Sequence, residues 1–80
     1  MIKKQINLTT IEQAQQFVSI CMALDFKVEL VSDPYVVDAK SIMGLLSLDF
    51  SKPITVQAHC AADDPFFDRI SAFLVKDGPA

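Results

Sequence analysis

Residues 26–32, with the sequence FKVELVS, decide the fold of this chain because their side chains alternate between apolar and polar types. Every second side chain from Phe26 to Leu30 would lie on one face of an extended strand, and the charged side chains between them on the other. Such a strand belongs in a sheet with one buried and one solvated face, which is typical of antiparallel sheets. The buried face needs a covering layer, so the rest of the chain should supply helices.

The flanking segments supply both further strands and helices. Strand patterns are predicted over residues 2–8, 35–39 and 52–60, and SDPY (residues 32–35) predicts a turn between two strands. Helices should follow a cap at Thr9 or Thr10, a cap at Ser41, and the Asp64-Pro65 pair. The order β-α-β-β-α-β-α predicts an α+β fold, an open-faced β-sandwich with a four-stranded antiparallel sheet and three helices on one face.

The first and last helices are each assigned an apolar face. In the first, which should run to about residue 24, the face consists of Ala14, Phe17, Val18, Cys21 and Leu24. In the last it consists of Phe66, Phe67, Ile70, Phe73 and Leu74, and Gly78 with Pro79 should end that helix.

Composition limits the classes of function. Eighty residues with 51% hydrophobic content form one domain, residues 1–80. A net charge of −3 and scattered basic residues argue against nucleic-acid binding. No apolar run approaches the ~20 residues of a membrane span, and MIKK is not followed by the apolar segment of a signal peptide. We therefore expect a cytoplasmic protein with free thiols at Cys21 and Cys60, no membrane partner and no cofactor.

The short helix SIMGLLSL (residues 41–48) is too apolar to be explained by one buried face. If Leu45 and Leu48 face the sheet, Ile42 lies at the margin while Met43 and Leu46 point largely away. Clusters of exposed apolar side chains mark partner surfaces. The alternative is that these side chains pack beneath a loop or against the following aromatic residue.

Several segments together resemble one protein family. KSIMGLLSL (residues 40–48), QFV (16–18), ITVQA (54–58), and the order and length of the chain are similar to HPr, the small histidine-containing phosphocarrier of the bacterial sugar phosphotransferase system. The similarity extends over essentially the whole chain, and the serine-helix motif is its most specific part. It implies protein partners: a general phosphotransferase enzyme, an HPr kinase-like enzyme or a transcriptional regulator.

The chain departs from this family at the phosphorylation motif. The family's His-Ala-Arg-Pro-Ala falls on TIEQA (residues 10–14), which puts Thr10 at the histidine, Glu12 at the arginine and Gln13 at the proline. An imidazole forms a labile phosphoryl adduct, whereas a threonine ester is stable and its hydroxyl needs an activating base. Glu12 would also repel the phosphate that an arginine attracts. The phosphocarrier site is therefore predicted to be degenerate.

His59 does not replace the missing histidine. In the family's fold the fourth strand runs antiparallel beside the first, so His59 should lie near the chain start and Thr10 near the opposite end. Cys60 would point to the other face of the strand, which argues against a His59–Cys60 metal site. No nucleophile–base pair, carboxylate pair or glycine-rich loop indicates an enzyme.

Ser41 has two interpretations. Serine is a strong N-cap, and capping alone stabilises a helix by roughly 1 kcal/mol. The resemblance also implies a regulatory role, because in Gram-positive family members a kinase phosphorylates this serine in carbon catabolite repression. One branch of the family keeps the serine and lacks the histidine. A phosphate there would suit the helix N-terminus and the adjacent Lys40.

The sequence thus predicts an HPr-like regulatory or interaction protein. Its docking residues would be Lys40, Ile42, Met43 and Leu46, with regulation at Ser41. The alternative is a phosphocarrier with an unconventional phosphoryl acceptor.

Overall fold

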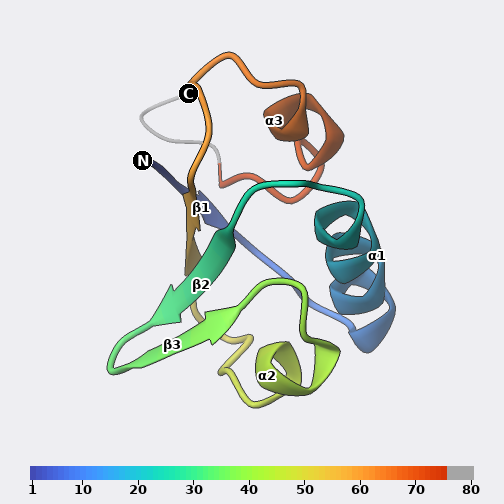
Figure 1. Ribbon diagram of the computed structural model, residues 1–80. Coiled ribbons are helices and arrows are strands. Elements are labelled where there is room, and N and C mark those ends of the chain that lie inside the picture. Colours follow the sequence, from blue (N-terminus) through green and yellow to red (C-terminus); the bar gives the residue numbers. More distant parts are fainter. Residues whose placement is uncertain (76–80) are drawn as a thin grey trace.

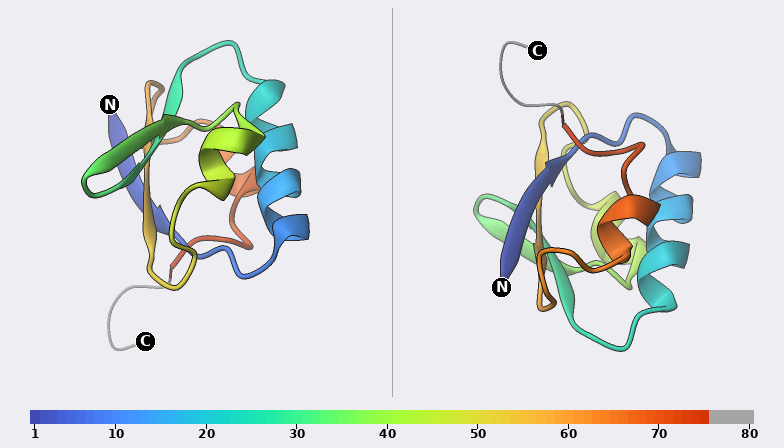
Figure 2. Two further views of the ribbon diagram at one scale, coloured as in Figure 1. Left: turned by 90° about the horizontal axis from the view of Figure 1, so that it is seen from below. Right: turned by 90° about the horizontal axis from the view of Figure 1, so that it is seen from above.

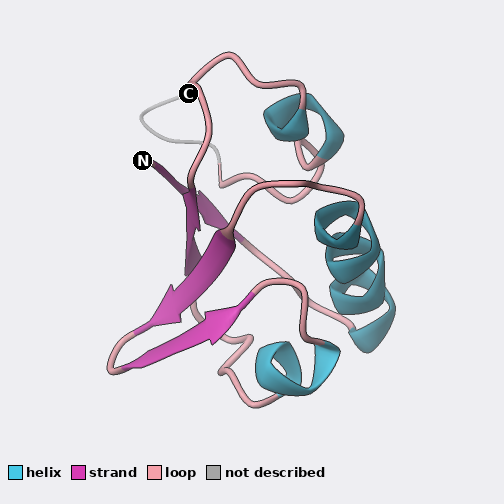
Figure 3. Cartoon of the chain, viewed as in Figure 1, coloured by secondary structure: helices cyan, strands magenta, loops and turns pink. Residues whose placement is uncertain are grey.

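A computed structural model describes residues 1–75 of the chain. Four strands form one antiparallel sheet in the order β1-β4-β2-β3. The helices all lie on one side of this sheet, and its other face is open (Figure 1; Figure 3). This arrangement confirms the predicted α+β architecture. In chain order the elements are β1 (Ile2–Ile6), α1 (Ile11–Met22), β2 (Val28–Ser32), β3 (Tyr35–Asp38), α2 (Ile42–Leu46), β4 (Ile54–Ala58) and α3 (Phe66–Arg69).

The central strand β4 connects the two halves of the sheet. It pairs with β1 from Ile2↔Ala58 to Ile6↔Ile54, and on its other side with β2, as in Leu30↔Val56. Ile54, Val56 and Ala58 are fully buried and alternate with partly exposed residues. The alternation read from the sequence of β2 and β4 is therefore confirmed, because a period of two places every second side chain on the covered face.

Helix α1 supplies the largest part of the covering layer. Thr10 is its N-cap, as expected for one of the two threonines, and the residues buried on α1 are Ala14, Phe17, Val18 and Cys21. The Phe17 ring meets Phe73 edge-on, with ring centroids 6.0 Å apart, a favourable aromatic geometry. Within residues 1–75, no helix is long and apolar enough to cross a membrane.

The two shorter helices flank α1. Figure 2 shows α2 beside the C-terminal half of α1, and Figure 1 shows α2 and α3 on opposite sides of that helix. Phe66 of α3 is almost completely buried and contacts Phe26 edge-on at 5.9 Å between ring centroids. Three helices thus close a single core against one face of the sheet.

The predicted length of the last helix was wrong. The helix does begin directly after the Asp64-Pro65 pair, where the Asp64 carboxylate accepts from the Phe66 N–H at 2.9 Å, but α3 ends at Arg69. The apolar spacing from Phe66 to Leu74 suggested a longer helix. Instead, Ile70 and Phe73 are buried from a turn, because the chain then pairs with β1. Gly78 and Pro79, expected to end the helix, lie outside the described residues.

The chain after α3 partly covers the outer edge of β1. The Asn7 N–H donates to the Phe73 carbonyl, and the Val75 N–H donates to the Gln5 carbonyl, both at 2.8 Å. Leu74 forms an isolated antiparallel bridge with Ile6. An uncovered edge strand invites pairing with other chains, and this contact shortens the edge available for it. The need to satisfy these backbone groups explains why the segment leaves the helical conformation.

We expect Phe17→Ala to lower the free energy of unfolding by about 3–5 kcal/mol, since it removes a fully buried ring from the centre of the core. Urea denaturation followed by circular dichroism measures the change. Gln15→Ala, on the exposed face of the same helix, is the matched control and should stay within about 0.5 kcal/mol of the parent. A loss below about 1 kcal/mol for Phe17→Ala would contradict the assigned core.

Candidate functional site

The N-terminus of α1 is occupied by its own capping contacts. The Thr10 hydroxyl oxygen accepts from the Gln13 N–H at 3.1 Å. The Gln13 side-chain oxygen reaches back to Thr9, accepting from its N–H at 2.8 Å and from its hydroxyl at 2.9 Å. This reciprocal arrangement resembles a capping box, which satisfies the free donors at a helix start. Thr10 and Gln13 therefore both have a structural use.

Glu12 lies exposed in the first turn of α1. A carboxylate there interacts favourably with the positive end of the helix dipole. It also places a negative charge two residues after Thr10, where an incoming phosphate would be repelled. Among residues 1–75, no ion pair involves Glu12. Thr10, Glu12 and Gln13 thus lie together at the N-terminus of α1, in an arrangement suited to starting a helix.

His59 lies far from Thr10 along the sheet. It directly follows the Ala58 partner of Ile2, whereas Thr10 follows the opposite end of β1. The His59 N–H donates to the Lys27 carbonyl at 3.0 Å, and its Nε2 is 3.5 Å from a carboxylate oxygen of Glu29. The ring is exposed, with 44% of its side-chain surface accessible. This placement agrees with the expected solvated position at the end of the fourth strand.

Helix α2 begins at Ile42, and the hydroxyl of the preceding Ser41 acts as its N-cap. The Ser41 Oγ accepts from the Gly44 N–H at 3.2 Å, and the Ser41 carbonyl accepts from the Leu45 N–H at 3.0 Å. Ser41 is only partly exposed. The capping interpretation of Ser41 is confirmed by these contacts, which account for its position without any modification.

The side chains of α2 divide between the core and the surface as the helical spacing predicted. Leu45 is fully buried and Leu48 is 7% exposed. Met43 is 78% exposed and Leu46 is 41% exposed, while Ile42 is partly buried against the core. We call Ile42, Met43 and Leu46 the docking face. An apolar surface on a capped, well-packed helix is suited to protein contact.

Gly44 allows α2 to approach the sheet closely. A Cβ atom at this position would lie 3.2 Å from the Val37 Cβ of β3, closer than ordinary van der Waals contact. The absence of a side chain therefore lets α2 rest on β3. The short distance between α2 and β3 sets how far the docking face lies from the sheet.

Lys40 occupies a position that the sequence did not predict. Its ammonium donates to the Leu24 carbonyl, just beyond the C-terminal end of α1, at 3.0 Å in a partly buried setting. We expected Lys40 to serve a phosphate on Ser41 or a partner, whereas the structure assigns its side chain a contact within the chain. The sequence contained one indication of this contact. The last turn of α1 has no basic residue, although a cation is favoured at that end of a helix.

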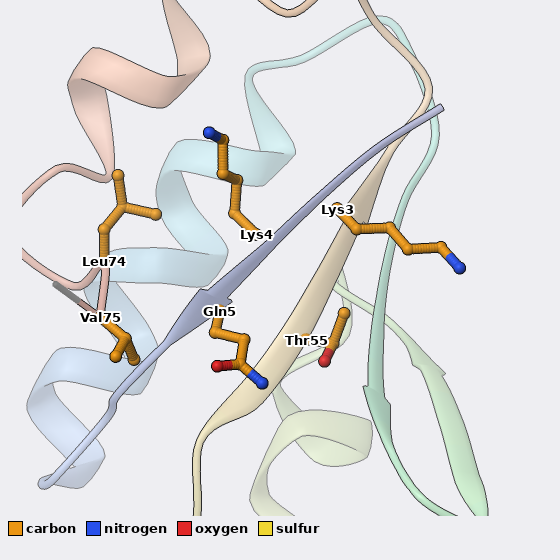
Figure 4. Close-up of a pocket in the computed structure, with 6 residues that line it drawn as sticks. All are labelled: Lys3, Lys4, Gln5, Thr55, Leu74 and Val75. Carbon is orange, nitrogen blue, oxygen red and sulfur yellow. The ribbon is translucent and has the colours of Figure 1, made fainter. Parts of the chain in front are cut away.

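A groove of about 460 Å³ runs along the outer edge of β1 (Figure 4). Figure 4 shows the ammonium groups of Lys3 and Lys4 pointing away from each other. The Lys4 ammonium lies instead over the Phe67 ring, 6.0 Å from its centroid. Because the two charges diverge, they do not form a joint site for one anion. The groove is lined by Lys3, Lys4, Gln5, Thr55, Leu74 and Val75.

The two cysteines are unpaired and poorly suited to nucleophilic chemistry. Burial raises the pKa of the Cys21 thiol from 9.0 to about 12. Burial, followed by the nearby Asp64 carboxylate, raises the pKa of Cys60. A thiol must ionise to act as a nucleophile or metal ligand. In the part of the chain that is described, no group of three or more His, Cys, Asp or Glu side chains is placed to hold a metal ion.

Comparison with known proteins points to one family. The family model described as "PTS HPr component phosphorylation site" matches residues 10–76. Among solved structures, the crystal structure of HPr-C-His from Thermoanaerobacter tengcongensis superimposes with a TM-score of 0.73 at 24% sequence identity, covering 90% of this chain and 89% of that one. At this identity the structural likeness concerns the fold. No curated protein gives a significant match.

We expect Ser41→Ala to lower the free energy of unfolding by about 1 kcal/mol, because the Gly44 N–H loses its acceptor. Ser41→Asp keeps a capping oxygen and should stay within a few tenths of a kcal/mol of the parent. Ser19→Ala, on the exposed surface of α1, controls for loss of a hydroxyl elsewhere. Equal stabilities of Ser41→Ala and Ser41→Asp in urea denaturation would exclude the capping role.

Proposed function

This chain belongs to the HPr family of the bacterial sugar phosphotransferase system, and we propose that within the family it is a regulatory or interaction protein. It would bind protein partners through the docking face of α2 and would not transfer a phosphoryl group from a histidine. The observation that carries this proposal is the exposure of Met43 and Leu46 beside a serine-capped helix N-terminus.

The chemistry at the start of α1 supports the loss of phosphocarrier activity. The Thr10 hydroxyl is a weak nucleophile that needs a neighbouring base, and the nearest titratable side chain along α1 is the acidic Glu12. A phosphoryl group on threonine forms a stable ester, which could not be passed on readily. The one histidine, His59, lies at the opposite end of β1 and β4. Both the acceptor and the phosphate-binding cation of the family motif are therefore replaced.

The docking face supports protein binding because its apolar side chains stay exposed while the helix beneath them is firmly held. Leu45 and the following Leu48 anchor α2 in the core, and the Ser41 hydroxyl accepts from the Gly44 N–H at its N-terminus. A pre-ordered surface loses little conformational entropy on binding. Exposed methionines are adaptable contact groups that fit varied partner surfaces. These features suit a general phosphotransferase enzyme, an HPr kinase-like enzyme or a transcriptional regulator.

Phosphorylation of Ser41 is the regulatory step that we propose. The Ser41 Oγ would form a bond to the γ-phosphorus of ATP as the bond to ADP breaks, and the hydroxyl proton would pass to a base of the kinase. The product places a dianion at the start of α2, where the N–H of Gly44 already points and the helix dipole is favourable. It also adds charge beside the docking face, which would change the choice of partner.

We expect incubation with an HPr kinase and ATP to add one phosphoryl group at Ser41, located by peptide mass spectrometry. Ser41→Ala is the matched control and should remain unmodified. In a parallel reaction with the general phosphotransferase enzyme and phosphoenolpyruvate, the chain should take up no phosphate. An unmodified Ser41 would refute the proposed regulation, and phosphate uptake from phosphoenolpyruvate would favour the alternative of an unconventional phosphocarrier.

We expect Met43→Asp to reduce kinase binding about tenfold or more, because it places a carboxylate in the centre of the docking face. Isothermal titration calorimetry measures the dissociation constant. Met22→Asp is the matched control, since Met22 is also a largely exposed methionine, at 66%, but lies on α1. Equal losses for the two variants would show that binding does not depend on the docking face.

A further inference from the structure

The connection between β3 and α2 is held by a set of short backbone contacts. The Lys40 N–H donates to a carboxylate oxygen of Asp38 at 2.8 Å, and the Ser41 N–H donates to the Asp38 carbonyl at 3.0 Å. Between them, Ala39 is fully buried and its N–H donates to the Val28 carbonyl at 3.0 Å. The backbone of residues 38–41 is therefore fixed to the sheet, and the Lys40 side chain leaves it from a defined position.

From this position the Lys40 ammonium reaches the end of α1. It donates to the Leu24 carbonyl at 3.0 Å, where the helix leaves carbonyl groups without partners and carries a partial negative charge. The last turn of α1 has no basic side chain of its own. Lys40 also lies near enough to Cys21 for its charge to oppose, as the smaller effect, the burial that raises the pKa of that thiol. Lys40 thus supplies the C-terminal cation of α1 from the segment that opens α2.

We propose that Lys40 is a positioning residue, which ties the start of the docking helix to the end of α1, and that a negative charge on Ser41 weakens this tie by competing for the same ammonium. The inference rests on the function proposed for α2 and adds a link between its regulatory serine and the neighbouring helix. Figure 2 shows that α2 and the C-terminal half of α1 lie side by side, as the link requires.

The competition follows from the strength of the two contacts. The Leu24 carbonyl is a neutral acceptor, whereas a phosphoryl group is a dianion, so the attraction between opposite charges adds to the hydrogen bond that the ammonium forms with it. Lys40 directly precedes Ser41, and its long, flexible side chain can reach either acceptor. When the ammonium moves to Ser41, the Leu24 carbonyl loses this donor. The segment before α2 then loses its side-chain contact with the segment after α1. A modification at Ser41 would then loosen the link between the start of the docking helix and the end of α1.

The first test compares the unmodified protein with Lys40→Met by nuclear magnetic resonance. We expect a change in the ¹³C shift of the Leu24 carbonyl and about tenfold faster exchange of the Gly44 and Leu45 amides, which bond to Ser41. Lys40→Arg should largely restore both readouts, because it keeps a long cationic donor. Lys52→Met removes an exposed lysine elsewhere and should change neither.

The second test compares Ser41→Glu with the neutral, similarly shaped Ser41→Gln. Both variants lose the hydroxyl cap, so only the charge differs. We expect Ser41→Glu to shift the Leu24 carbonyl signal in the same direction as Lys40→Met, and Ser41→Gln to leave it near the parent value. In the double variant with Lys40→Met, the difference between Glu and Gln should disappear.

An unchanged Leu24 carbonyl shift in Lys40→Met would overturn the positioning role. Equal shifts in Ser41→Glu and Ser41→Gln would overturn the competition. Both readouts come from the free protein, so they stand apart from the kinase and binding assays. A failure of those assays would refute the proposed function and leave the Lys40 contact intact.

Discussion

Burial of one face of the sheet against the helices is the interaction on which the rest of the structure depends. Val28, Leu30, Ile54, Val56 and Ala58 are all fully excluded from solvent on that face. An 80-residue chain has little surplus core, so each helix must contribute its apolar side to the same layer. The longest, α1, does so with four buried residues. The five-residue α2 contributes mainly through Leu45, with Leu48 buried just after the helix. Ile42 is only partly buried, and Met43 and Leu46 are left at the surface.

Local periodicity in the sequence was sufficient to predict the buried faces of several strands and helices. Alternation in β2 and β4 and the helical spacing in α1 and α2 each depend on residues close together in the chain, so the sequence alone was enough to assign buried faces. The predicted length of the last helix was wrong because a distant strand sets where the helix ends. Phe73 and Val75 pair with β1 through backbone hydrogen bonds. A helical pattern of apolar residues cannot show that a strand edge competes for the same segment.

The same distinction between local and long-range contacts applies to the candidate site. The cap at Ser41 and the outward direction of Met43 and Leu46 could be predicted, because both follow from the geometry of a single short helix. The role of Lys40 could not, since its acceptor belongs to Leu24, sixteen positions earlier in the chain. The close packing of Gly44 against Val37 likewise depends on how α2 meets β3. Contacts between elements therefore hold the docking face in place.

The central claim is that this HPr-family chain meets its partners through α2. It is tested most directly by titrating ¹⁵N-labelled protein with an HPr kinase in the absence of ATP and following the backbone amide signals. We expect the largest changes at Met43 and Leu46, extending to Ser41, with the open face of the sheet unaffected. Changes concentrated on the outer edge of β1 or on the open face, with α2 unchanged, would contradict it.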